Sequence, residues 1–111
     1  MRGELGSGGA GERGLTARQR AALKALAHSL KPIQHIGKEG VTDALVGSVQ
    51  EALHTRELLK LKVLEVAPGS ARGIADELAN RIEGAHVVQV IGRTVVVYRR
   101  HPERPRIVLP R

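Results

Sequence analysis

The sequence predicts one α/β domain, a two-layer sandwich built on a mixed four-stranded sheet, and three observations lead to it. Apolar residues recur at helical spacing or alternate at strand spacing in the order α-β-α-β-α-β-β. A helical segment separates each of the first three strands from the next, which makes those strands parallel if they share one sheet. A two-residue link joins the last two strands, which makes the final strand antiparallel. Three helices and one small sheet are most simply arranged in two layers.

The glycine-rich start of the chain is set apart from this domain. The stretch MRGELGSGGAGERG is nearly half glycine and shows no apolar periodicity. We expect residues 1–14 to be a flexible tail, residues 15–111 one domain, and residues 102–111 an extended C-terminal arm. The start lacks the apolar region of a secretory signal, and no stretch is apolar for long enough to cross a membrane. We expect a cytoplasmic protein, and the absence of cysteine agrees with this.

The first helix is predicted for the segment LTARQRAALKALAHSL, residues 15–30. Thr16 is the cap, and Gln19 three residues later completes a capping box. The Lys31-Pro32 step ends the helix, because a residue before proline disfavours helical dihedrals. The helix buries one stripe and exposes its cations: the stripe is Leu23, Leu26 and Leu30 with Ala22 and Ala27, and the cations are Arg18, Arg20 and Lys24.

The first strand and the second helix are joined by a loop with two glycines. PIQHI, residues 32–36, predicts a short strand, and GKEG follows at residues 37–40. The run TDALVGSVQEALHTR, residues 42–56, then resumes helical spacing. Thr42 is its expected cap, and Asp43 suits the positive end of the helix dipole.

The second strand is predicted for ELLKLKVLEV, residues 57–66, where apolar and charged residues alternate. A turn follows, and Ser70 caps a third helix that ends near Gly84. In a two-layer sandwich one face of the sheet can stay uncovered, and the lysines of this strand would point to it. The two faces of the strand are Leu59, Leu61 and Val63 on one side and Lys60, Lys62 and Leu64 on the other.

The chain ends with a hairpin and an arm. Residues 86–91 and 94–100 are apolar runs joined by a Gly-Arg pair, which is a good hairpin signal. Three prolines in residues 102–111 predict an extended arm. Within it, Ile107–Leu109 would add a short edge segment to the sheet.

Net charge is +7 at pH 7, and the cations are concentrated toward the two ends of the sequence. Residues 13–38 carry six basic residues and no acid, and residues 93–111 carry six arginines against Glu103. Residues 39–92 hold five basic and eight acidic residues. This distribution favours a face that binds a polyanion, while any single cation can equally be ordinary solvated surface. One tyrosine and no Phe or Trp exclude aromatic base stacking, so RNA contact would use charge, backbone amides and shape.

The sequence contains no recognisable catalytic or metal-binding pattern. No serine lies in a G-x-S-x-G context, the histidines lack H-x-x-x-H spacing, and no Walker A or dinucleotide fingerprint is present. We therefore expect no enzyme activity, no metal, no cofactor and no small-molecule substrate.

The GKEG loop is the remaining candidate for a binding site. Gly37 and Gly40 permit a close backbone approach, and the loop leads toward a helix N-terminus that favours anions. Lys38 adds a cation at the tip, and Lys31 lies just before the preceding strand. The alternative is a plain strand-to-helix turn, for which glycines are common.

Four segments together resemble the YhbY family, the bacterial single-domain members of the group named for chloroplast RNA splicing and ribosome maturation. They are LKPIQHIGKEGVTDAL, ELLKLKV, HVVQVIGRTVVVYRR and RIVLPR, and the resemblance spans Leu15 to Arg111. It implies a fold similar to the C-terminal domain of the third bacterial translation initiation factor, a mixed four-stranded sheet with helices on one side. It also implies RNA binding and association with precursors of the large ribosomal subunit.

The resemblance assigns RNA-backbone contact to the G-x-x-G loop, and by extension to neighbouring lysines. Glu39 departs from this role, since its charge opposes phosphate; we expect it to point away or to lie near the helix amides. We predict a non-catalytic, monomeric RNA-binding protein, with a protein–protein adaptor that docks on ribosomal proteins or other acidic partners as the alternative. The residues predicted to contact RNA are Gly37, Lys38, Glu39, Gly40, Lys31, Arg18, Arg20, Lys24, Lys60, Lys62, Arg99 and Arg100.

Overall fold

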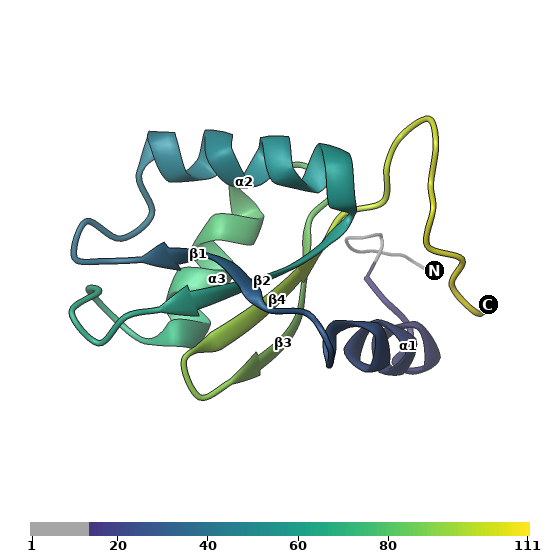
Figure 1. The fold of residues 1–111 in the computed structure, drawn as a ribbon, viewed down its shortest axis with the longest axis horizontal. Coiled ribbons are helices and arrows are strands. Elements are labelled where there is room, and N and C mark those ends of the chain that lie inside the picture. Colours follow the sequence, from purple (N-terminus) through teal and green to yellow (C-terminus); the bar gives the residue numbers. More distant parts are fainter. Residues whose placement is uncertain (1–13) are drawn as a thin grey trace, which may run out of the picture.

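A computed structural model describes residues 14–111, and its elements follow the predicted order. The predicted tail, apart from Gly14, lies outside the described residues. The elements are α1 (Ala17–Ala27), β1 (Pro32–Ile36), α2 (Asp43–Arg56), β2 (Leu58–Val63), α3 (Ala71–Asn80), β3 (His86–Ile91) and β4 (Thr94–Tyr98) (Figure 1).

The four strands form one mixed sheet in the order β1-β2-β4-β3. β1 and β2 are parallel, and β4 is antiparallel to both of its neighbours, β2 and β3. The first three strands therefore share one direction and the last runs against them, which confirms the prediction. The hairpin partner β4 lies between β2 and β3, and the buried Val95, Val96 and Val97 account for its central place.

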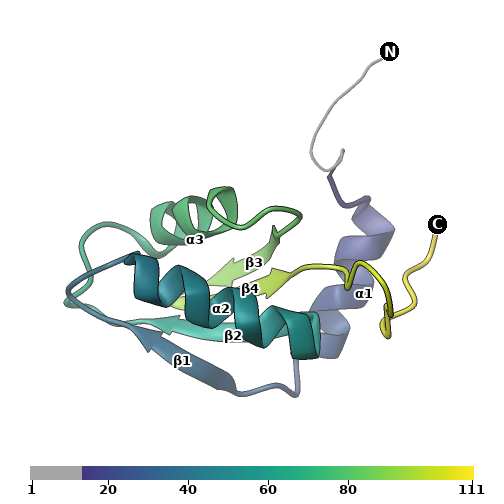
Figure 2. The same cartoon turned by 90° about the horizontal axis from the view of Figure 1, so that it is seen from above.

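Two hydrophobic clusters lie on opposite faces of the sheet. α2 and α3 cover one face, where they pack on Leu59, Leu61 and Val63, as the alternation in β2 predicts (Figure 2). α1 lies on the other face, where Leu23 and Ala27 join a second cluster. The sandwich of the sheet with α2 and α3 is confirmed, but the expectation that all helices lie on one side was wrong for α1. The likeness to the initiation-factor domain stays a prediction.

Each helix begins at the residue that the sequence indicates. The Thr16 hydroxyl accepts a hydrogen bond from the Gln19 amide, and the Gln19 side chain accepts one from the Thr16 amide, both at 3.0 Å. Thr42 and Ser70 likewise accept hydrogen bonds from amides in the first turns of α2 and α3. These local bonds satisfy amides that a helix start leaves unpaired, which is why the starts were predictable.

The end of α1 differs from the prediction. The helix stops at Ala27 instead of continuing to Leu30, and Lys60 Nζ donates hydrogen bonds to the carbonyls of Leu30 (2.9 Å) and His28 (3.4 Å). This lysine of β2 therefore binds the backbone of the turn that follows α1. Leu26, in the last turn of α1, is 49% exposed, and Leu30, beyond the helix, is 37% exposed, so their predicted burial was wrong.

The arm forms no strand, so the expected edge segment was wrong. Ile107 and Leu109 instead pack against the cluster under α1, and Gln19 Nε2 donates to the Pro110 carbonyl at 3.1 Å. The amide of Ile107, which a strand would need for pairing, donates to the carboxylate of Glu57.

Candidate nucleic-acid interface

Among the helices and strands of residues 14–111, acidic side chains occur only in α2 and α3. α1 and all four strands contain no aspartate or glutamate, although they hold five cations. The layer formed by α2 and α3 carries the acids Asp43, Glu51, Asp76 and Glu77. The side of the sheet on which α1 lies, here called the basic face, therefore presents cations without neighbouring carboxylates from the sheet or α1.

The fold brings several predicted lysines together on the basic face. Lys24 of α1 and Lys60 of β2 line one hollow together with His28, Gln89 and Ile91. Lys60 is half-buried because it binds the carbonyls after α1, whereas Lys24 is exposed.

Lys62 extends the basic face toward the end of β1. It is exposed, two residues beyond Lys60, and its register partner is His35 near the end of β1. His35 comes two residues before Gly37, so Lys62 lies between α1 and the GKEG loop.

The GKEG loop lies at the opposite end of the sheet from α1 (Figures 1 and 2). Gly40 N donates to the Gly37 carbonyl at 3.0 Å, which closes a tight turn, and Gly40 has a φ of 68°. A side chain at Gly40 would also meet Pro68, since its Cβ would lie 3.0 Å from Pro68 Cγ. The turn thus requires Gly40, and it leaves Lys38 and Glu39 exposed at the tip.

The N-terminus of α2 is capped and already carries an acidic side chain. Thr42 caps it, the Asp43 carboxylate binds Arg81, and Arg81 Nη1 also donates to the Val41 carbonyl at 2.9 Å. An anion at the GKEG loop would therefore meet Lys38 before the helix amides.

Two of the predicted arginines have structural contacts instead. Arg20 Nη1 donates to the carbonyls of Val87 (2.7 Å) and Val88 (2.8 Å), at the irregularity in β3. The side chain of Arg99 is half-buried and runs past Gly84. The guanidinium of Arg20 is held by the fold, and the Nε atom of Arg99 is buried without a hydrogen-bond partner in the described residues, so both arginines are weaker candidates for RNA than the exposed lysines.

The remaining predicted cations are exposed but dispersed. Arg18 lies in the first turn of α1, Lys31 precedes β1, and Arg100 follows β4. His86 adds no charge to this region, because burial and then the nearby Arg20 lower its pKa.

Glu57 is a key residue that the sequence did not reveal. It links α2 to β2 with a φ of 61°, and only 2% of it is exposed. Its carboxylate accepts three backbone hydrogen bonds, one from His101 just before the arm (2.7 Å) and two from Arg106 (2.8 Å) and Ile107 (2.8 Å) within it. The one sign of this role in the sequence is that an acid, and not a glycine, occupies the junction between the second helix and the second strand.

The protonation of Glu57 follows from these contacts. Burial raises its pKa, but the amides of His101, Ile107 and Arg106, with the charge of His101, outweigh burial. The pKa therefore lies below the ordinary value, and the carboxylate is ionised at neutral pH.

Within residues 14–111, no three His, Asp or Glu side chains gather in a way that could hold a metal ion. No helix in this part of the chain is both long and apolar enough to cross a membrane.

Comparisons with known proteins identify one domain family and relatives that are named as RNA-binding proteins. The model of the CRS1/YhbY (CRM) domain matches residues 15–99. The probable RNA-binding protein YqeI of Bacillus subtilis is 38% identical over 96 residues, which cover 86% of this chain and 99% of the relative. An RNA-binding protein of Haemophilus influenzae is 34% identical, over 87% of this chain and 96% of its own. The solution structure of SAV1595 from Staphylococcus aureus matches with a TM-score of 0.73 and 35% identity, over 86% of this chain and 99% of that one.

Proposed function

The chain belongs to the CRS1/YhbY (CRM) domain family, and from that premise we propose that it is a non-catalytic, monomeric RNA-binding protein of the cytoplasm. Its RNA would be ribosomal, in precursors of the large subunit, as the resemblance of the sequence to YhbY proteins implies. The GKEG loop and the basic face would contact the RNA backbone at successive phosphates.

The absence of acids from α1 and the sheet is the observation that carries this proposal. Phosphate binding depends on cations that no carboxylate neutralises, and Lys24 and Lys62 meet this condition on the basic face. Lys38 would continue the contact at the loop, where no ion pair within residues 14–111 engages it.

RNA affinity should fall steeply as salt is raised. Three lysine–phosphate contacts predict that the logarithm of the association constant decreases by about 2 to 3 units per tenfold increase in salt. A titration of a labelled hairpin RNA at several salt concentrations measures this slope. An affinity that hardly changes with salt would contradict the proposed electrostatic contact.

The ribosomal partner is tested by sedimenting cell extracts through a gradient before and after nuclease treatment. The protein should travel with large-subunit precursors and leave them when the RNA is digested. Retention on the particles after digestion would favour the adaptor, which binds through acidic protein surfaces. In-cell crosslinking with sequencing of the attached RNA identifies the contacted segment.

A further inference from the structure

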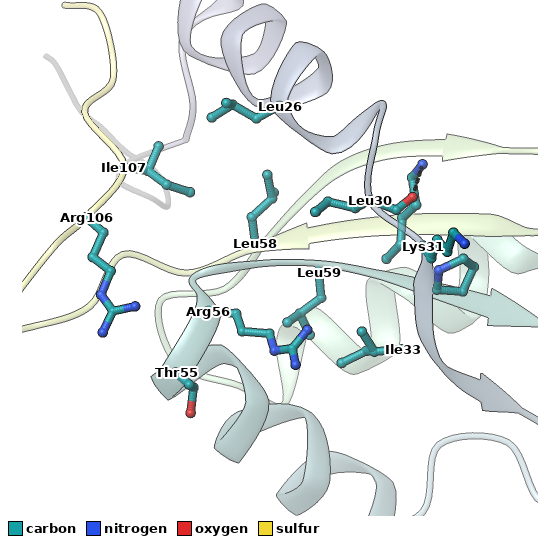
Figure 3. A pocket seen from close by; sticks show the side chains of 12 residues that line it. Leu26, Leu30, Lys31, Ile33, Thr55, Arg56, Leu58, Leu59, Arg106 and Ile107 are labelled. Atoms are coloured by element: carbon teal, nitrogen blue, oxygen red, sulfur yellow. Dashed lines mark hydrogen bonds between the residues drawn. The ribbon is translucent and has the colours of Figure 1, made fainter.

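We infer that a groove between α1, the end of α2 and the C-terminal arm binds one unpaired nucleotide of the RNA. Its base would pack on an apolar floor, and its phosphate would be held by cations at the rim (Figure 3). This inference rests on the proposed function and adds a subsite to it.

The floor of the groove gathers apolar side chains that the fold leaves uncovered. Leu26, Leu30 and Ile33 are three of the six large apolar residues exposed in residues 14–111, and all three line this groove. The groove has a volume of about 610 Å³, which lies within the range of small-ligand sites. These three side chains give the groove a continuous apolar floor.

The groove exists because β1 is short at its start. The pairing of β1 with β2 begins at Pro32 opposite Lys60, so Leu58 and Leu59 have no partner strand on that side. α1 and the end of α2 border the resulting gap from the two faces of the sheet.

The arm supplies the third wall of the groove through Arg106 and Ile107. The amides of both residues donate to Glu57 Oε1 at 2.8 Å. Glu57 is therefore a positioning residue for this wall, since it holds the backbone that carries both side chains.

The rim is positively charged and lacks acids. Lys31, Arg56 and Arg106 line the groove and are exposed, and no Asp or Glu lines it. Neither arginine forms an ion pair with another residue in the range 14–111. Cations around an apolar floor complement a nucleotide, which joins an anionic phosphate to a flat base.

The two arginines favour a base over an acidic peptide as the occupant. Guanidinium planes stack on nucleobases, so Arg56 or Arg106 can cover a base whose other side rests on the leucines. In this way the groove would bind a base although no aromatic side chain lines it.

The test compares two hairpin RNAs that differ at one bulged position, where one carries a base and the other an abasic sugar. Both RNAs have the same charge, so backbone contacts cancel in the ratio of their affinities. Wild-type protein should bind the RNA with the base about tenfold more tightly, because it packs that base in the groove.

The variant Leu26→Ala/Leu30→Ala should bring this ratio close to one. Both side chains are exposed, and alanine suits the helical position of Leu26, so the thermal midpoint should stay near that of wild type. Val66→Ala is the matched control, because Val66 is 66% exposed and lies outside the groove; it should keep the tenfold preference.

Equal binding of the two RNAs by wild-type protein would overturn the nucleotide site and leave RNA binding intact. A preference that survives in Leu26→Ala/Leu30→Ala would also overturn it. Failure to bind either RNA would overturn the proposed function together with this site. An acidic leucine-containing peptide that binds wild type but not the double variant, with no base preference, would assign the groove to a protein partner.

Discussion

Replacing Glu57 with alanine is expected to lower the free energy of unfolding by about 3 kcal/mol, since three hydrogen bonds to a buried carboxylate are lost. The amides of His101, Arg106 and Ile107 would then lack their acceptor, and the arm would separate from the domain. Urea unfolding at neutral pH measures the loss. Trypsin provides a local readout, because the bond between Arg106 and Ile107 should be cleaved faster when the arm is released.

Glu57→Gly is the matched variant, because comparing it with Glu57→Ala separates the effect of losing the carboxylate from the effect of backbone strain. A φ of 61° suits glycine better than any residue with a side chain, so glycine relieves strain that alanine retains. We expect stability to decrease from wild type to Glu57→Gly to Glu57→Ala. An alanine variant as stable as wild type would show that the carboxylate does not hold the arm, because alanine keeps the backbone strain and lacks only the carboxylate.

The contribution of Glu57 should also depend on pH. Its pKa is lowered in the folded protein, so its stabilisation is complete above the pKa of the unfolded state. That stabilisation is lost as the pH falls through the lowered folded-state pKa. The difference in unfolding free energy between wild type and Glu57→Ala should therefore shrink in acid, and a constant difference would contradict this linkage.

The parts of the fold that were predictable are those set by neighbours in sequence. Thr16, Thr42 and Ser70 fix the helix starts through bonds to amides three residues away. The alternation around Leu61 and the Gly-Arg hairpin link likewise act within a few residues. Together these signals give the element order and the strand directions without further information.

The parts that were not predictable depend on contacts between distant residues. Lys60 binds carbonyls about thirty positions earlier, in the turn that follows α1. Glu57 binds amides more than forty positions later and holds the arm against the domain. A charged residue shows no sign in the sequence of whether its partner is solvent, RNA or a backbone group elsewhere in the fold.

The same reasoning explains the outcome for the candidate site. Charge counting indicates a polyanion-binding face, because acids are missing over whole segments. Counting cannot separate Arg20, which binds carbonyls of β3, from Lys24, which is exposed one turn later. Only the packing of α1 on the sheet distinguishes them.

Neutralising Lys24 and Lys62 together is expected to weaken RNA binding by about 10- to 50-fold at low salt. Each lysine would contact one phosphate, so the variant Lys24→Gln/Lys62→Gln should also reduce the slope of log affinity against log salt by about 1.4 to 1.8. Both side chains are exposed and neither binds another residue within 14–111, so the thermal midpoint should hardly change. Titration of one hairpin RNA at several salt concentrations gives both quantities.

Gly47→Glu/Gln50→Glu is the matched control, because it lowers the net charge by the same two units on α2, away from the GKEG loop, and a side chain at position 47 meets nothing within 4 Å. Both positions are exposed on the helix layer, on the opposite side of the sheet from the basic face. Charges there lie farther from the bound RNA, so affinity should fall only slightly and the salt slope should stay unchanged. If both variants weaken binding equally and with the same slope, RNA senses only the net charge of the protein, and the basic face is not its binding surface.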